Sequence, residues 1–189
     1  QGLNLRHQQY FDRLVLQNDL ARAESASLLH FASETGMSQM VRLLLHLGVP
    51  VDARRASSHF SQRMVTPLWS AALHGHQHSM RCLLEAKANP NSTQEGRNKE
   101  PLLTAACLSI HPNIVDVLLE YGADVELRDE DGRTALASIC TSFRERCANA
   151  QRLLNAGADI NAADELRQTP LMHACYQQHE GLVKLLLDN

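Results

Sequence analysis

The amino-acid sequence predicts an all-α chain, an α-solenoid of stacked helix-turn-helix units joined by hairpin-like finger loops. The first observation is an internal repeat: Thr66-Pro67-Leu68-Trp69 recurs as Thr169-Pro170-Leu171-Met172, with weaker copies starting at Ser27, Glu100 and Thr134. The five starts are spaced by 39, 34, 34 and 35 residues, and a fixed period of this length is the signature of repeat architectures. The second is composition: 44% of residues are apolar but only 4% are aromatic, which favours packed helices over a β-sandwich.

Each repeat is predicted to form two short helices. The Thr or Ser that opens a copy can cap the first helix, and a Pro directly after it occupies the first helical position, where its missing N–H is harmless. A run of leucines marks the second helix, which ends at Gly48, Gly122 or Gly157, because glycine readily adopts the left-handed conformation of a helix end. Lys87 stands at the equivalent position of the second repeat and should cost about 1 kcal/mol there. Helices this short are not stable alone, so stacked neighbours must supply the core.

These residues resemble the ankyrin repeat over roughly residues 24–189. The family's T-P-L-H opening, its Ala pair and its G-A-D-x-N close are clearest at 66–69, 71–72 and 157–161. The resemblance implies an ankyrin-repeat α-solenoid with β-hairpin-like fingers. The expected organisation is an N-terminal capping helix or half repeat at 1–23, repeat 1 at 24–53, an inserted finger loop at 54–62, and repeats 2 to 5 at 63–93, 94–127, 128–162 and 163–189, the last of them truncated.

Charge and cysteine content argue against several protein classes. The net charge is −3, without the basic excess that nucleic-acid binding favours, and no apolar run approaches the length of a membrane span. Five cysteines without CxxC spacing favour a reducing, intracellular environment, cytoplasmic or nuclear. The sequence has no initiating Met and stops within a helical pattern, so we expect it to be part of a longer protein, monomeric as a fragment and without cofactors.

Three histidines, His74, His76 and His78, alternate in a short stretch that could suggest a metal site. However, the repeat register places His76 at the inter-helix turn, with the other two at the ends of different helices. No Cys, Asp or Glu lies between Leu73 and Met80 to complete a tetrahedral set. We therefore expect one turn residue and two exposed positions, and keep a metal-binding domain as an unfavoured alternative.

The remaining candidate chemistry also fits the repeat register. Cys140 and Cys175 occupy the second position of the Ala pair, where a small buried residue is expected, while Cys107 lies just beyond such a pair, near the expected groove, and was expected to be accessible. The resemblance implies that His30 makes hydrogen bonds between repeats. Trp69 takes the same position in repeat 2, as a packing residue or as an aromatic anchor for a partner. Without a phosphate loop or catalytic motif, we expect this chain not to be an enzyme.

The resemblance implies that function lies on a concave face formed by the finger loops and the exposed ends of the first helices. Carried over position by position, the predicted partner-binding residues are Arg54, Arg55, His59, Phe60, Arg63, Trp69, Leu73, His74, Arg97, Lys99, Cys107, Leu108, Arg133, Thr141, Ser142 and Tyr176. The 54–63 loop carries three arginines and no acid, whereas later fingers are rich in Asp and Glu. Such a gradient is either ordinary solvated surface or complementary to a partner with an acidic segment, because complementary potentials set partner choice.

The sequence therefore predicts a non-catalytic module that binds a protein or peptide, of the scaffold or adaptor kind, within a larger intracellular protein. One alternative remains open beside the metal-binding domain. The chain could be the substrate-recognition segment of a larger enzyme, such as a ubiquitin ligase or a bacterial effector.

Overall fold

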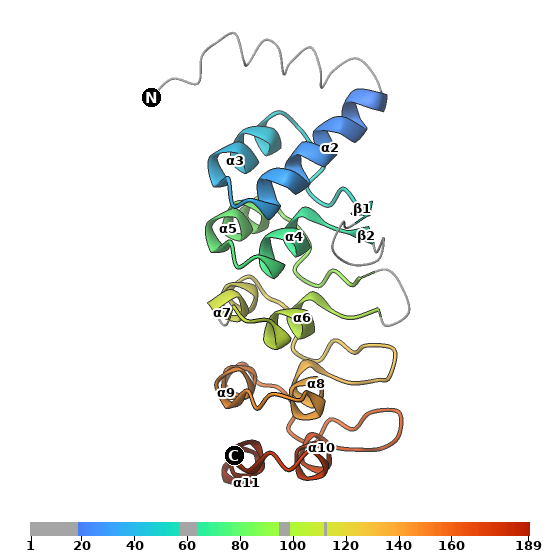
Figure 1. The fold of residues 1–189 in the computed structure, drawn as a ribbon, viewed down its shortest axis with the longest axis vertical. Coiled ribbons are helices and arrows are strands. Elements are labelled where there is room, and N and C mark those ends of the chain that lie inside the picture. Colours follow the sequence, from blue (N-terminus) through green and yellow to red (C-terminus); the bar gives the residue numbers. More distant parts are fainter. Residues whose placement is uncertain (1–18, 57–63, 95–98, 112) are drawn as a thin grey trace. The chain divides into compact units, whose positions relative to one another are not determined.

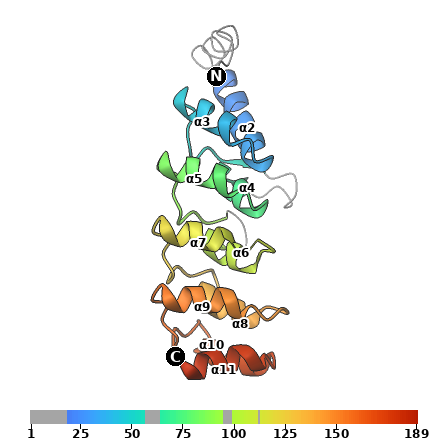
Figure 2. The ribbon, with the colours of Figure 1, turned by 90° about the vertical axis from the view of Figure 1, so that its left-hand side faces the viewer.

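The computed structural model describes residues 19–56, 64–94, 99–111 and 113–189. The chain divides into two compact units, residues 1–89 and 90–189, and each is described by itself below. In the described residues of both units, successive first helices contact one another and so do successive second helices. Figures 1 and 2 show this in the second unit, where α6, α8 and α10 form one row and α7, α9 and α11 the other. The structure is mostly helical, with the stacked helix pairs that the repeat predicted.

Unit 1 contains two helix pairs and a small hairpin. The first pair is α2 (Asp19–Glu34) and α3 (Ser38–His46), and the second is α4 (Pro67–Leu73) and α5 (Gln77–Glu85). Strands β1 (Arg55–Ala56) and β2 (Met64–Val65) pair antiparallel between them, so the second repeat's finger begins as a genuine β-hairpin. Ser27 does not cap the first helix, contrary to the expectation, because α2 begins eight residues earlier, at Asp19. The predicted boundary between residues 23 and 24 falls inside this helix.

Unit 2 contains three helix pairs. They are α6 (Leu102–Leu108) with α7 (Asn113–Glu120), α8 (Ala135–Thr141) with α9 (Cys147–Asn155), and α10 (Pro170–Tyr176) with α11 (Glu180–Asp188). In the described part of its fingers, pairing is limited to an isolated bridge between Thr93 and Pro101. Backbone hydrogen bonds tie neighbouring fingers together, as from the Glu165 N–H to the Asp131 carbonyl, 3.1 Å away.

The helix ends follow the predicted chemistry. The hydroxyls of Thr66, Thr134 and Thr169 each accept a hydrogen bond from the backbone N–H three residues later, which satisfies a donor that the helix leaves unpaired. Gly48, Gly122 and Gly157 have φ of 83°, 79° and 89° at the ends of the second helices. Lys87 has φ of 69° at the equivalent position, so the predicted strain of a left-handed lysine is confirmed.

Polar side chains link neighbouring helix pairs beneath the apolar contacts. In unit 1, His30 Nε2 donates to the Val65 carbonyl at 2.9 Å, which confirms its predicted role between repeats. His76 Nε2 donates to the Glu34 carbonyl at 2.9 Å. Gly36 leaves room for that ring, since a Cβ on Gly36 would lie 2.6 Å from His76 Nδ1. None of the described helices is long and apolar enough to cross a membrane.

Candidate functional site

The first-helix ends of unit 2 present a row of variable side chains. Helices α6, α8 and α10 contact one another in sequence, and each supplies residues from its last turn. Leu108, Thr141 and Ser142 are half-buried, while the Tyr176 side chain is 85% exposed at the end of α10. Four of the predicted partner-binding residues therefore lie on adjoining elements of one unit, and Tyr176 is the most accessible of them.

The half-buried residues of this row also hold the helix ends in shape. The Thr141 hydroxyl donates to the Ser138 carbonyl at 3.0 Å, and the Ser142 hydroxyl to the Ile139 carbonyl at 2.9 Å. The Leu108 carbonyl accepts from the Arg146 guanidinium at 2.6 Å. Because these hydroxyls are already committed, Thr141 and Ser142 offer a partner shape and methyl surface more than new donors.

The fingers of unit 2 add charged side chains, most of them in ion pairs. Lys99 is exposed and its Nζ lies 3.8 Å from a Glu130 carboxylate oxygen. Arg133 Nη1 lies 3.0 Å from the Asp131 carboxylate. Pairs as exposed as these contribute little to stability, so they can rearrange when a partner binds. The predicted site residue Arg97 lies outside the described residues.

A buried carboxylate organises the last finger. Asp164 Oδ1 accepts hydrogen bonds from the Leu166 and Gln168 N–H groups at 3.0 and 2.8 Å, and Oδ2 lies 2.9 Å from His173 Nε2. Burial alone raises the pKa of Asp164, but the hydrogen bonds from Gln168, His173 and Leu166 outweigh it and hold the pKa below its usual value. Arg133 Nε lies 3.8 Å from the same carboxylate, so Asp164 links two neighbouring fingers.

In unit 1, the described basic residues of the predicted site lie at the start of the hairpin. Arg54 and Arg55 are both exposed, Arg55 within β1. At the end of α4, Leu73 is half-buried and His74 is exposed. The other predicted residues of this loop, His59, Phe60 and Arg63, lie outside the described residues.

The histidine stretch is built as a helix-turn-helix junction. His74 Nδ1 donates to the Ser70 carbonyl at 2.9 Å, and its ring stacks on that of His76 with centroids 6.2 Å apart and planes 10° apart. His76 spends its Nε2 on Glu34, as described above, which supports its prediction as a turn residue. No group of three or more His, Cys, Asp or Glu side chains arranged to hold a metal occurs among the described residues.

Two predicted partner-binding residues lie in the interior. Cys107 is fully buried, so the expectation that it is accessible is wrong: α6 turns this position inward, and burial raises the pKa of its thiol to about 12 despite Arg146 and Arg152 nearby. Trp69 is only 2% exposed, which favours packing over an anchor role. Burial likewise raises the pKa of the Cys140 thiol to about 12, and its predicted buried position is confirmed.

The sequence interpretation missed the most exposed apolar side chains of unit 2. Ile110 and Phe143 are 74% and 98% exposed in the turns that follow α6 and α8, and Leu166 is 74% exposed on the last finger. The insertions in those two turns were visible as extra residues in the repeat, and this irregularity was the available signal. Cys175 also departs from expectation, since it is exposed rather than buried.

Known proteins show the same repeat. The family described as "Ankyrin repeats (3 copies)" matches residues 8–94, 29–129 and 102–189. The human protein "Ankyrin repeat and SOCS box protein 16" is 35% identical over 173 residues, which cover 88% of this chain and 37% of that protein. The Caenorhabditis elegans protein "Ankyrin repeat and KH domain-containing protein mask-1" is 32% identical over 161 residues, 85% of this chain and 6% of that protein.

A further relative is the mouse protein "Ankyrin repeat and SOCS box protein 6", 36% identical over 92 residues that cover 49% of this chain and 22% of that protein. The chain thus spans less than two fifths of the length of each of these relatives. Together, the matching family, the caps, the left-handed helix ends and the stacked helix pairs lead to one conclusion: the chain belongs to the ankyrin repeat family.

Proposed function

We propose that this chain is a non-catalytic module that binds a protein or peptide segment. In each unit, the binding surface consists of the finger loops and the exposed ends of the first helices. Ankyrin repeats are protein-protein interaction modules, and the identity of the partner and the contact residues are the new part of the proposal.

The observation that carries the proposal is the contrast between the two sides of the first helices in unit 2. Their inward positions are conserved in kind, small or apolar and fully buried, as at Ala106, Leu136 and Ala137. Their last-turn positions hold Leu108, Thr141 and Tyr176, which differ in size and polarity from one repeat to the next. A rigid, repetitive support with variable exposed residues is suited to recognition, because the support limits the entropy lost on binding.

The thiols support a non-catalytic role. A cysteine acts as a nucleophile through its thiolate, and burial holds the thiols of Cys107 and Cys140 in the protonated form at neutral pH by raising both pKa values to about 12. Both have a structural explanation as small buried residues of α6 and α8.

The charges of the sequence suggest what the partner carries. Residues 1–89 hold nine Lys and Arg against six Asp and Glu, a net charge of +3, and residues 90–189 hold nine against fifteen, a net charge of −6. The exposed Arg54 and Arg55 lie in the positive half. We therefore infer a partner with an acidic segment that meets the hairpin of unit 1.

The test begins with a partner captured by the chain and identified by mass spectrometry, then purified for calorimetry. Tyr176→Ser should weaken binding by at least tenfold, because an exposed aromatic side chain at a first-helix end is the kind of residue that dominates interfaces. The control is Asn155→Ala, an exposed residue at the end of α9. Equal affinities for the wild type and the Tyr176 variant would contradict the proposed surface in unit 2.

A second candidate places the same surface in a larger enzyme, as its substrate-recognition segment. The observation in its favour is that two of the relatives are named for ankyrin repeats together with a SOCS box, a second module beside the repeats. Depletion of the whole protein from cells separates the candidates. A substrate should then lose ubiquitination and accumulate, whereas the partner of a simple scaffold should keep its abundance and modification.

We also propose an intracellular location and a monomeric state for this chain. The support is that all five cysteines are free thiols, as is usual in reducing compartments. Fluorescence microscopy of the tagged whole protein tests the location. Light scattering of the purified chain tests the oligomeric state.

A further inference from the structure

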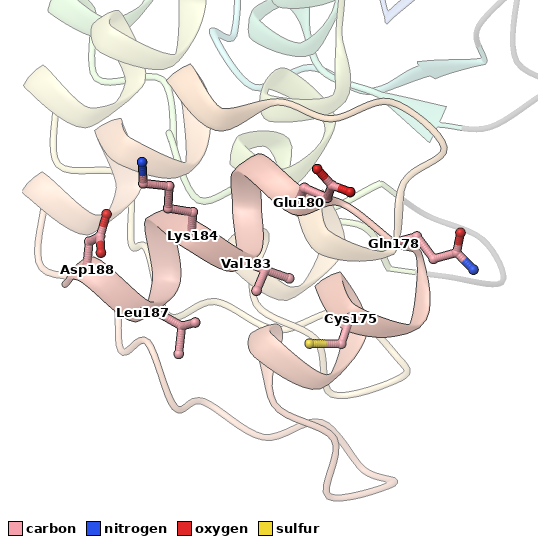
Figure 3. Close-up of a pocket in the computed structure, with 7 residues that line it drawn as sticks. All are labelled: Cys175, Gln178, Glu180, Val183, Lys184, Leu187 and Asp188. Atoms are coloured by element: carbon pink, nitrogen blue, oxygen red, sulfur yellow. The ribbon is translucent and has the colours of Figure 1, made fainter.

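The outer face of the last helix pair carries an apolar hollow that the proposed binding function does not use. It has a volume of about 440 Å³ and lies against α10 and α11. Cys175, Val183 and Leu187 form its apolar part, and polar side chains of Gln178, Glu180, Lys184 and Asp188 complete the lining (Figure 3). The Leu187 side chain is 67% exposed. An apolar surface with a polar rim commonly marks an interaction site.

The first helices show what normally covers this face. Cys175 corresponds by repeat position to Ala106 and Cys140, which are 1% and 0% exposed. Met172 corresponds to Leu103 and Ala137, which are 3% and 0% exposed, yet Met172 itself is 56% exposed. In unit 2, α6 is covered by α8, and α8 by α10. The same positions are therefore buried wherever a further helix pair follows.

The second helices repeat the contrast. Val183 corresponds to Val115 and Ala150, both fully buried, whereas Val183 is only partly buried. Here too α7 is covered by α9, and α9 by α11. The hollow between Cys175, Val183 and Leu187 thus continues an interface that unit 2 already uses twice.

Hydrogen bonds between neighbouring pairs specify the incoming chemistry further. In each case, the residue that caps a second helix donates from its side chain to the carbonyl at the end of the preceding first helix. Arg146 Nη1 donates to the Ser109 carbonyl, and His179 Nε2 to the Ser142 carbonyl, both at 2.7 Å. The next acceptor in this series is the carbonyl of Gln177, the residue that ends α10.

A second series runs along the loops that enter the fingers. The Asn91 side chain accepts from the Asp124 N–H, and the Glu126 side chain from the Asp159 N–H, both at 2.8 Å. Asn161 holds the next position of this series by repeat register and is exposed. It places a side-chain acceptor beside the same end face.

We propose that this end face is a stacking surface for one further helix-turn-helix unit, joined to it in the same polypeptide. The incoming unit presents small residues to Cys175 and apolar side chains to Val183 and Leu187. It places a His or Arg at the cap of its second helix, against the Gln177 carbonyl, and a backbone N–H against Asn161. A cis connection is favoured because the loops after α7 and α9 return the chain to this same face of their own pairs.

The test is the rate at which iodoacetamide alkylates Cys175, followed by peptide mass spectrometry. The 189-residue chain is compared with the polypeptide extended by the sequence that its own gene encodes after Asn189. The extension should slow alkylation of Cys175 at least tenfold, while Cys147, half-buried on α9, reacts at an unchanged rate. An unchanged rate at Cys175 would overturn the proposal, as would an extension that encodes no further residues.

Matched variants separate stacking from general shielding. In the extended chain, Leu187→Asp should restore the fast alkylation of Cys175, because it places a charge in the covered hollow. Leu166→Asp, at a similarly exposed leucine of the finger, should not. Equal effects of the two variants would contradict the assigned face.

A third arm tests the fit and the source. A chain with residues 157–189 repeated once after Asn189, with Cys175→Ser in the added copy, supplies a unit of this repeat with His179 as the capping donor. It should protect the original Cys175, and His179→Ala in the added copy should weaken that protection. Protection only when the unit is supplied as a separate peptide would overturn the cis assignment. Partner binding through Tyr176 is measured separately, so either proposal can fail alone.

Discussion

At the residue scale, the repeat register and local chemistry together explain side chains that look functional when read alone. His76 belongs to a suggestive histidine stretch, but its ring bonds to Glu34 and lies directly against Gly36. A glycine is needed there on two grounds, because its φ is 74° and because a Cβ would collide with the ring. The histidine and the glycine are therefore one structural device that joins adjacent helix pairs.

Asp164 gives a prediction at the same scale. Its folded-state pKa is lowered, so its contribution to stability is present above the usual aspartate pKa of 3.8 and is lost as pH falls through the folded value. Asp164→Asn should therefore be less stable than wild type at pH 7, with a difference that shrinks below pH 4 as the wild-type carboxylate protonates. Urea denaturation across this pH range measures it. Asp188→Asn, at the exposed end of α11, controls for the loss of one charge, and a pH-independent difference would contradict the mechanism.

At the scale of elements, helix ends were more predictable than helix starts. The Thr caps and the glycine ends have distinct residue preferences that a sequence displays. The start of α2 does not, because Ser27 matches the opening of a repeat while the helix continues to Asp19 through residues without a stop signal. Repeat register thus located the helix pair correctly but misplaced the first turn by eight residues.

The end of α5 supplies the element-scale prediction. Lys87 has φ of 69°, where a side chain costs roughly 1–2 kcal/mol relative to glycine. Lys87→Gly should raise the free energy of unfolding by about 0.5–1 kcal/mol, because the greater freedom of glycine in the unfolded chain offsets part of the gain. Lys87→Ala keeps a Cβ and should leave stability nearly unchanged. Urea denaturation compares the two, and equal effects would contradict strain as the cause.

At the scale of the whole molecule, charge is distributed unevenly along the sequence. The net charge of +3 in residues 1–89 and of −6 in residues 90–189 is concealed in the total of −3. Exposed charges act on binding chiefly through steering and partner choice, and salt screens them. The consequence is an association rate that depends on ionic strength more than on core packing.

Charge reversal tests this consequence. Arg54→Glu together with Arg55→Glu should weaken the captured partner through a slower association rate, with a larger effect at about 50 mM salt than at about 500 mM, since the Debye length shrinks severalfold. The thermal midpoint should change little, because both side chains are exposed. Lys184→Glu, an exposed lysine of α11, is the control. A salt-independent loss, or none, would contradict the acidic-partner hypothesis.

The sequence by itself determined the repeat, the fold class and the helix caps, because these follow from local preferences that recur every 33 to 35 residues. It also placed Arg54, Lys99 and Tyr176 on exposed elements correctly. Tertiary structure alone decided which side of each short helix is covered. Cys140 and Cys175 share one repeat position, yet the first is buried and the second exposed, because α10 covers α8. Burial depends on the neighbouring helix pair, and no residue's own identity records whether that neighbour is present.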